Sequence, residues 1–294
     1  MKVLIAGATG FVGARLVLRL LERNDQVLVL TRDPAKVKAG TPLSWDAFIQ
    51  APPAEVDAVV NLSGENLFAR RWNSEFKELI RNSRVEATRR LVAAVGTGEF
   101  RPKTLVNASA IGIYGPHGDE TLAEDASAGS DFLSGVCRDW EAEARTGEEK
   151  GMRVVLLRIS VVLGRDGGAL RQMLPPFKMF AGGPVGSGAQ WFSWIHIDDL
   201  VGLILLALDH PQVTGPLNAT APDPRTNREF SAALGRALGR PSWLPMPGFA
   251  LRLLVGEVAE IILAGQRVLP KRAQELGFVF RFPTVDAALA DLVN

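Results

Sequence analysis

Three glycines near the start of the chain have the spacing of a phosphate-binding turn. Gly7, Gly10 and Gly13 follow directly on the apolar residues 3–5, and apolar side chains then recur at helical spacing. A backbone without Cβ atoms turns sharply and lets a pyrophosphate approach, while the N–H groups at the start of a helix meet the negative charge. The alternative is that these glycines only tighten a strand–helix connection. The pattern predicts a dinucleotide site with contacts at Gly7, Thr9, Gly10, Phe11, Val12 and Gly13.

The end of the next predicted strand, residues 26–30, indicates which dinucleotide is bound. An NAD site usually has an acidic residue about 20 positions beyond the glycines, where it holds the ribose 2′-hydroxyl. Thr31 and Arg32 occupy that place here. Because an arginine suits a 2′-phosphate, we predict that Thr31 and Arg32 contact NADP. Asp33 lies close enough to keep NAD as the alternative.

Further along the chain, small residues follow a predicted strand over residues 56–62. Leu62, Ser63 and Gly64 stand at its carboxyl end, where small side chains leave room for a cofactor. We expect all three to contact the dinucleotide. Arg71 and Trp72 precede the following helix, and we interpret them as a capping and packing cluster rather than as a site.

The elements that position these residues alternate between strand and helix. Strands are predicted over residues 3–5, 26–30, 42–45, 56–62, 103–109 and 152–159, with long helices over residues 74–95 and 131–150. This alternation is typical of an α/β fold with a parallel, doubly wound sheet. We assign residues 1–165 to a dinucleotide-binding domain.

The second half of the chain has a different character. Residues 166–294 are predicted to form a smaller, mostly helical substrate lobe, except that sheet elements at about residues 190–220 return to the dinucleotide-binding domain. The glycine-rich residues 164–168 and 181–190 resemble loops over a pocket, and a strand is expected over residues 191–197. A helix capped near Asp198 should follow over residues 198–208, then a strand over 217–220. Further helices are predicted over residues 226–239, 247–264 and 270–276.

Composition excludes several classes of function. The 294 residues include 33 Lys and Arg against 32 Asp and Glu, so the net charge of +1 favours neither nucleic acid nor an anionic membrane as a partner. The one cysteine, Cys137, rules out an internal disulfide or a cysteine metal cage, and the three histidines are scattered. No apolar run has the length of a signal peptide or of a membrane span, so we expect a cytoplasmic protein.

Several of these stretches together resemble a known family. The residues 7–13 (GATGFVG), the strand that leads to Tyr114 and Gly115, and residues 194–199 (WIHIDD) look like an extended short-chain dehydrogenase/reductase. Ser83 and Arg84, with residues 183–188 and 191–196, resemble an atypical epimerase-family subgroup that carries a C-terminal domain of unknown function. The resemblance implies a Rossmann fold, bound NAD(P) with Arg84 among its contacts, and a homodimer formed through two long helices.

The chain departs from this family at its catalytic pair. The superfamily normally uses Tyr-x-x-x-Lys on the helix after the fifth strand, where the lysine lowers the tyrosine pKa and the phenol moves a proton. Tyr114 is the one tyrosine, and Gly118 stands four residues beyond it. On the helix, Cys137 and Glu141 are possible acid–base groups. We expect instead a buried cysteine and a solvated glutamate.

The resemblance leaves three candidate catalytic residues. Ser109 stands where the superfamily has a substrate-orienting serine, and Tyr114 should lie near the nicotinamide. His196 lies in a run that helps to form the substrate wall in extended members, although a purely structural histidine is an equally good interpretation. Trp191 and Trp194 should point to opposite faces of their strand, one of them toward the pocket.

Two functions fit these observations. The first is an NADP-dependent oxidoreductase or epimerase-like enzyme that acts on a small carbonyl or sugar-like substrate with an unusual acid–base group. The second is a non-catalytic protein that senses NADP(H) and passes its state to a partner. The cofactor motif and pocket-like loops favour the enzyme, and the missing pair favours the sensor.

Overall fold

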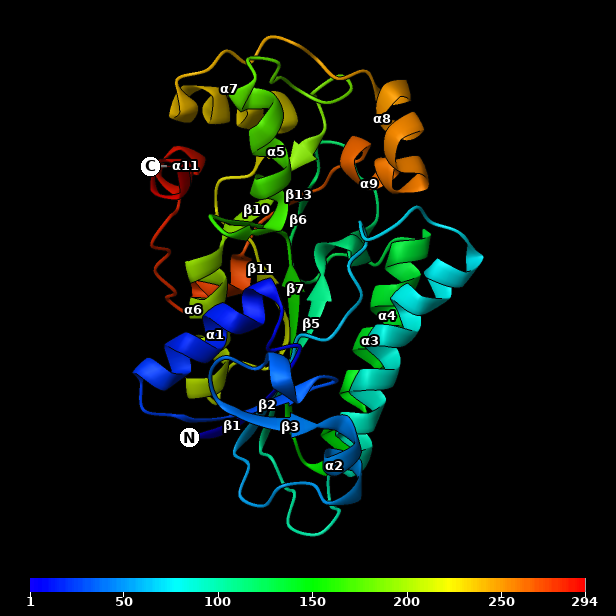
Figure 1. The fold of residues 1–294 in the computed structure, drawn as a ribbon, viewed down its shortest axis with the longest axis vertical. Helices are drawn as coiled ribbons and strands as arrows, with labels where there is room; N and C mark the ends of the chain where they lie inside the picture. Colours follow the sequence, from blue (N-terminus) through cyan, green and yellow to red (C-terminus); the bar gives the residue numbers. More distant parts are fainter. Residues whose placement is uncertain (294) are drawn as a thin grey trace.

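A seven-stranded parallel sheet forms the centre of the computed structural model, which describes residues 1–293 (Figure 1). Its strands lie in the order β11-β7-β5-β4-β1-β2-β3, and every neighbouring pair is parallel. The bounds are β1 Lys2–Ala6, β2 Gln26–Thr31, β3 Thr41–Ser44, β4 Ala58–Asn61, β5 Thr104–Ala110, β7 Arg153–Ile159 and β11 Gly215–Ala219. The chain starts at β1, builds outward through β2 and β3, and then crosses to β4. The strand order therefore reverses beside β1, which is where doubly wound sheets bind ligands.

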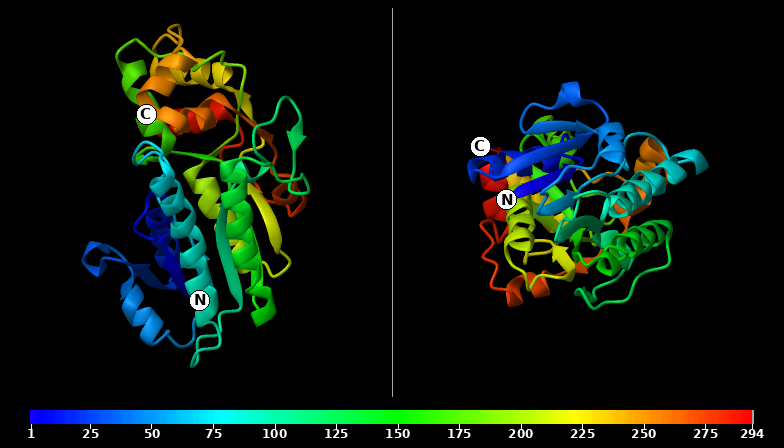
Figure 2. Two further views of the ribbon diagram at one scale, coloured as in Figure 1. Left: turned by 90° about the vertical axis from the view of Figure 1, so that its right-hand side faces the viewer. Right: turned by 90° about the horizontal axis from the view of Figure 1, so that it is seen from below.

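Helices cover both faces of this sheet. On one face α1 (Phe11–Glu22) packs against α6 (Ile197–Asp209), and their apolar stripes share one core with the sheet. On the other face α3 (Ser74–Ala94) and α4 (Phe132–Arg145) lie side by side, as Figure 2 shows, with α2 (Trp45–Gln50) near the edge of the sheet. The predicted α/β fold with a parallel, doubly wound sheet is confirmed.

A second core holds the smaller lobe together. It is formed by β8 (Val161–Gly164), β10 (Trp194–His196), α5 (Gly168–Lys178), α7 (Asn227–Leu238) and α11 (Val285–Val293), around the fully buried Trp194 and Phe230. Two short pairs lie beside it, β9 (Trp191–Phe192) with β12 (Arg225–Thr226), and β6 (Thr121–Leu122) with β13 (Arg267–Val268). The remaining helices are α8 (Gly248–Val255), α9 (Ala259–Leu263) and α10 (Lys271–Glu275).

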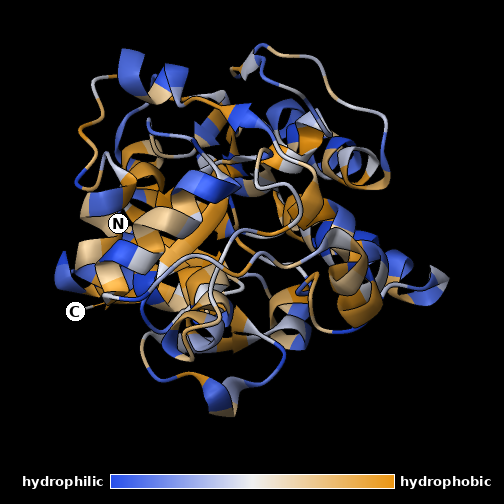
Figure 3. Cartoon of the chain, turned by 90° about the horizontal axis from the view of Figure 1, so that it is seen from above, coloured by the Kyte–Doolittle hydropathy of each residue, from blue (hydrophilic) through white to orange (hydrophobic). Residues whose placement is uncertain are grey.

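The two parts are interleaved in sequence. After β8 and α5 the chain returns to the main sheet as α6 and β11, and then re-enters the smaller lobe at β12. Seen from above, the interior strands are predominantly hydrophobic and many peripheral helix residues are hydrophilic (Figure 3). Within residues 1–293, no helix combines the length and hydropathy needed to cross a membrane.

Several predicted boundaries were wrong. The strand expected over residues 191–197 is broken at Ser193, whose hydroxyl donates to the Gln266 carbonyl and accepts from the Val268 N–H. Helix α6 begins at Ile197, with His196 rather than Asp198 as its N-cap. The helix expected over residues 247–264 is interrupted at Gly256, which has a φ of +73°. Helices α5 and α11 were not predicted.

Candidate functional site

The glycine turn between β1 and α1 has the geometry that its sequence predicts. Gly7 has a φ of +80°, and a Cβ atom on it would lie 2.6 Å from the Leu62 carbonyl oxygen. A Cβ on Gly13 would lie 2.4 Å from the Gly7 carbonyl oxygen. Only glycine fits at these two positions, because the backbones of β1, α1 and the end of β4 meet there. The turn thus brings the helix N-terminus against the switch point of the sheet.

The first turn of α1 is left open for an anion. Gly10 is the N-cap and provides no side-chain hydrogen bond, and no acidic residue lies in the first turn. The N–H groups at this end of the helix therefore carry the partial positive charge of the helix dipole without a capping carboxylate. Thr9 and Gly10 are exposed beside them, while Val12 is half-buried. This part of the site fits a pyrophosphate.

The Phe11 side chain packs against the smaller lobe from the same turn. A Cβ atom on Gly164, Gly167 or Gly168 would lie 2.3, 2.5 or 3.0 Å from its ring. The ring is therefore seated on the glycines between β8 and α5. These glycines were expected to lie over a pocket, and they instead hold the smaller lobe against the start of α1. Because the ring is packed in this way, the predicted contact of Phe11 with a cofactor would be made by its backbone.

The carboxyl end of β4 is fixed by a buried polar network. The Asn61 side chain donates to Thr88 Oγ1 at 2.8 Å and to Asn107 Oδ1 at 2.7 Å, and its own oxygen accepts from the Ser63 N–H. Leu62 and Ser63 are half-buried next to Gly7, and Gly64 is exposed. Sequence reasoning missed Asn61, although an asparagine that ends an apolar strand is itself a signal, since a buried amide needs partners.

Arg32 and Asp33, the two residues expected to decide between NADP and NAD, have different surroundings at the end of β2. The Asp33 carboxylate accepts from the Ala35 N–H and pairs with Lys36 at 3.2 Å, so it caps a short 3₁₀ helix, Pro34–Lys36. Thr31 is buried, and its hydroxyl accepts from the Asp33 N–H. Arg32 is exposed and makes no hydrogen bond or ion pair within residues 1–293. The guanidinium is thus the available group at this edge.

Ser109 belongs to a buried charged network at the end of β5. Its hydroxyl donates to Glu141 Oε1 at 2.7 Å, and Arg158 donates to both oxygens of Glu141, at 2.9 and 3.0 Å. All three side chains are buried. Burial by itself lowers the pKa of Arg158, but Glu141 and Tyr114 outweigh it and raise that pKa. The expectation of a solvated Glu141 was wrong, because α4 turns this carboxylate toward β5 and β7.

The Tyr114 hydroxyl is fully engaged within the protein. It donates to Asn218 Oδ1 at 2.7 Å and accepts from Arg158 Nη1 at 3.0 Å, and the side chain has no exposed surface. Burial raises its pKa despite the nearby Arg158. This arrangement favours a structural role, joining β7, β11 and the 3₁₀ helix Ile111–Tyr114.

Arg84 on α3 and Cys137 on α4 lie near each other, and the Cys137 thiol lies beside Ser109. Cys137 is buried, as expected, and burial raises the pKa of its thiol to about 12. The Arg84 guanidinium donates to the carbonyls of Ile80 and Glu65 and lies over the Trp140 ring. It also packs against Gly64, since a Cβ there would lie 3.0 Å from its Cζ. Burial lowers the pKa of Arg84 although the nearby Glu65 charge opposes this shift, and within residues 1–293 no carboxylate forms an ion pair with Arg84. A cation is thus held between the end of β4 and Cys137.

His196 lies apart from this cluster. Its Nδ1 accepts from the Asp198 N–H at 3.1 Å, so it caps α6, and its ring stacks on Phe282 at 3.8 Å. Its Nε2 faces an Asp291 carboxylate oxygen at 3.4 Å. Burial lowers the pKa of the imidazole, against the opposing effect of nearby aspartates, and so favours its neutral form. These contacts favour the structural interpretation of His196.

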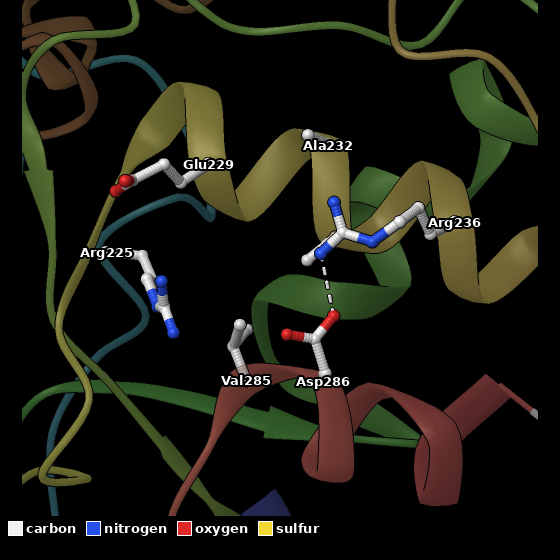
Figure 4. Close-up of a pocket in the computed structure, with 7 residues that line it drawn as sticks. Arg225, Glu229, Ala232, Arg236, Val285 and Asp286 are labelled. Atoms are coloured by element: carbon white, nitrogen blue, oxygen red, sulfur yellow. Dashed lines mark hydrogen bonds and ion pairs between the residues drawn. The ribbon is translucent and has the colours of Figure 1, made fainter.

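A separate hollow lies in the smaller lobe, between α7 and α11 (Figure 4). It encloses about 190 Å³, and Arg236 pairs with Asp286 across it at 2.8 Å. None of the residues that line it belongs to the glycine turn. Within residues 1–293, no three His, Cys, Asp or Glu side chains are grouped to hold a metal ion.

The glycine turn, the switch point and the polar ends of β2, β4 and β5 define a Rossmann-type NAD(P)-binding protein. The model of the NAD-dependent epimerase/dehydratase family matches residues 3–219, and that of a domain of unknown function, DUF1731, matches residues 246–292. The chain belongs to the NAD-dependent epimerase/dehydratase family.

Several relatives resemble the whole chain over most or all of their own length. The chloroplastic epimerase family protein SDR39U1 homolog of Arabidopsis thaliana is 47% identical over 100% of this chain and 87% of its own. The epimerase family protein YfhF of Bacillus subtilis is 38% identical over 100% and 98%. A crystal structure of human epimerase family protein SDR39U1 (isoform 2) with NADPH superposes with a TM-score of 0.94, at 38% identity and 99% coverage of both chains.

Proposed function

We propose that this protein is an NADP(H)-binding oxidoreductase or epimerase-like enzyme that acts on a small carbonyl or sugar-like substrate. The choice of NADP(H) rests on the two side chains at the end of β2. The Asp33 carboxylate caps a 3₁₀ helix, and the Arg32 guanidinium is unpaired within residues 1–293. An unpaired guanidinium at this edge attracts a 2′-phosphate, and the carboxylate that would repel it is neutralised by Lys36. The NADPH in the human relative's structure supports the same choice.

The residues present fit the cofactor along its whole length. The open N-terminus of α1 would hold the pyrophosphate, Thr31 and Arg32 the adenosine ribose, and Leu62, Ser63 and Gly64 would border the switch point. When bound, NADPH supplies a hydride at its nicotinamide ring. The end of β5, with Ser109, is where the remaining polar side chains are gathered.

Two residues are proposed to act on the substrate there. The Ser109 hydroxyl donates its hydrogen bond to Glu141 and lies beside the Cys137 thiol, so a remaining lone pair on its oxygen would accept a hydrogen bond from a substrate hydroxyl and orient it. Arg84 uses two guanidinium nitrogens on backbone carbonyls and has further N–H groups. Because Arg84 forms no ion pair within residues 1–293, its charge would stabilise negative charge that develops on a carbonyl oxygen. In this proposal Arg84 supplies the charge that lysine provides in typical relatives.

The NADP(H)-sensing protein is the second candidate. It is supported by Tyr114, the one phenol of the chain, whose hydroxyl is fully buried and bound on both sides by protein groups. A sensor would bind NADPH through the same glycine turn without turnover. The two candidates thus share the cofactor site and differ only at the end of β5.

Turnover separates the two candidates. We would incubate the protein with NADPH and a broad panel of aldehydes, ketones and keto-sugars, and follow the absorbance of the reduced nicotinamide. For the enzyme, Ser109→Ala and Arg84→Gln should each lower kcat by at least about tenfold, the scale of one lost transition-state contact. Tyr114→Phe, the control, should keep most of the activity. No substrate-dependent oxidation across the panel, with NADPH still bound, would favour the sensor.

A further inference from the structure

The segments around residues 180 and 243 lie at the end of the smaller lobe that is uppermost in Figure 1, and they carry exposed apolar side chains. Two segments run side by side there, since the Trp243 indole N–H donates to the Phe180 carbonyl and the Leu244 N–H donates to Gly182. Met179 is 71% exposed and Trp243 65% exposed, with Phe180 and Leu244 also on the surface. We call these four residues the apolar tip. Large side chains of this kind are usually buried, so their grouping on a surface marks a place of contact.

Helix α8 continues this surface. It begins two residues after Met246, whose N–H donates to Pro184 in the neighbouring segment. Its side chains Phe249 and Leu253 stand one turn apart and are 73% and 75% exposed, and Leu254 is exposed beside them. The helix is thus apolar on its outer face as well as on the face that buries Leu251. Leu251 is the buried residue of α8, so packing within the described chain accounts for the inner face and leaves Phe249 and Leu253 mostly exposed.

The segments that form this surface carry only basic residues, although Glu257 and Glu260 follow α8 directly. Residues 167–190 and 237–256, which carry the tip and α8, contain four basic residues and no Asp or Glu. Arg252 is neutralised by Glu260, at 2.7 Å. Arg171 and Lys178 are exposed, and the Arg240 guanidinium lies 4.5 Å from the centre of the Phe180 ring. Cations therefore stand directly beside exposed aromatic and aliphatic side chains.

We propose that the apolar tip and α8 bind the surface of an anionic lipid bilayer. Tryptophan and phenylalanine enter the boundary between headgroups and acyl chains, and neighbouring bases attract anionic headgroups. A second copy of the chain fits less well, because a symmetric dimer would bring the same unneutralised bases face to face. The net charge of the whole chain, +1, does not show this local excess of basic residues. The proposal therefore replaces, for this surface alone, the expectation that a membrane is not a partner.

Vesicle sedimentation tests the proposal. The full chain should sediment with vesicles of phosphatidylcholine and 30% phosphatidylglycerol, and much less with phosphatidylcholine alone. Lys178→Gln with Arg240→Gln should lower the partition coefficient by about 25-fold, at about fivefold for each base. Phe249→Ser should also release the protein, and since this side chain is mostly exposed, the variant should still fold. NADPH binding by each variant shows that the cofactor domain is intact.

The matched controls are two substitutions on helices that flank the main sheet. Ile49→Ser removes an exposed apolar side chain from α2, and Arg90→Gln removes an exposed base from α3. Both should sediment as the unchanged protein does. The proposal is overturned if the unchanged protein stays in the supernatant, or if the controls lose as much binding as the patch variants. It is also overturned if size-exclusion chromatography shows a dimer that Phe249→Ser dissociates, since the occupant is then a second copy. None of these outcomes depends on the choice of NADPH or on turnover.

Discussion

The buried pair between Glu141 and Arg158 should be the largest single electrostatic contribution to the stability of the site. Glu141→Gln keeps the shape of the side chain but leaves the Arg158 guanidinium buried without a carboxylate. Breaking such a pair from one side costs about 3–5 kcal/mol, because the remaining charge is not solvated. With a urea m-value of about 3 kcal/mol/M, near the top of the usual range for small proteins, the midpoint should fall by about 1–2 M.

Helix α4 also provides the matched control for this experiment. Glu143 stands two residues further on and pairs with Arg89, whose side chain is half exposed. Glu143→Gln removes the same charge from the same helix and should move the midpoint much less, since water screens this pair. The double variant Glu141→Leu with Arg158→Met should be more stable than Glu141→Gln, because no charge is left buried. Equal midpoints for Glu141→Gln and Glu143→Gln would refute the reasoning.

Two further predictions concern groups whose pKa is shifted by burial. The Cys137 thiol, with a pKa of about 12, should not react with a disulfide reagent at pH 8 in the native protein, whereas one thiol should react after unfolding; a rapid reaction in the native state would contradict its burial. The pKa of His196 is lowered on folding, so its contribution to stability is present above pH 6.5, its unfolded value, and is lost as the pH falls, because the unfolded chain then binds the proton. The free energy of unfolding measured from pH 8 to pH 5 should fall more steeply for the unchanged protein than for His196→Asn, which keeps a capping side chain, and parallel curves would contradict this.

The parts of the fold that local patterns encode were predictable. Residues 3–13 combine a buried strand, a glycine turn and an amphipathic helix within a single stretch, and the structure has all three. The strands of the parallel sheet are short apolar runs between helices, so their order of appearance defined the class of fold. Helix α5 was missed because Pro175 and Pro176 lie inside it, and proline normally argues against a helix interior.

The polar cluster could not be predicted because its contacts are distant in sequence. Glu141 meets Arg158 from β7 and Ser109 from β5, which are 17 and 32 residues away along the chain. The sequence pattern of α4 indicates only that Glu141 is a charged residue on a helix. Burial, and the contacts of Tyr114 and His196, depend on how separate elements pack. The family resemblance predicts Arg84 as a cofactor contact, and this stays a prediction.

The central claim is that the glycine turn and Arg32 select NADPH. Calorimetric titration of the purified protein with NADPH and with NADH, for the unchanged chain and for Arg32→Asp, tests it most directly. NADPH should bind at least about tenfold more tightly than NADH to the unchanged chain. Arg32→Asp should weaken NADPH by about 1–3 kcal/mol, the scale of a charge-assisted contact, while leaving NADH nearly unaffected. Tighter binding of NADH by the unchanged chain, or an equal loss for both cofactors in Arg32→Asp, would contradict the claim.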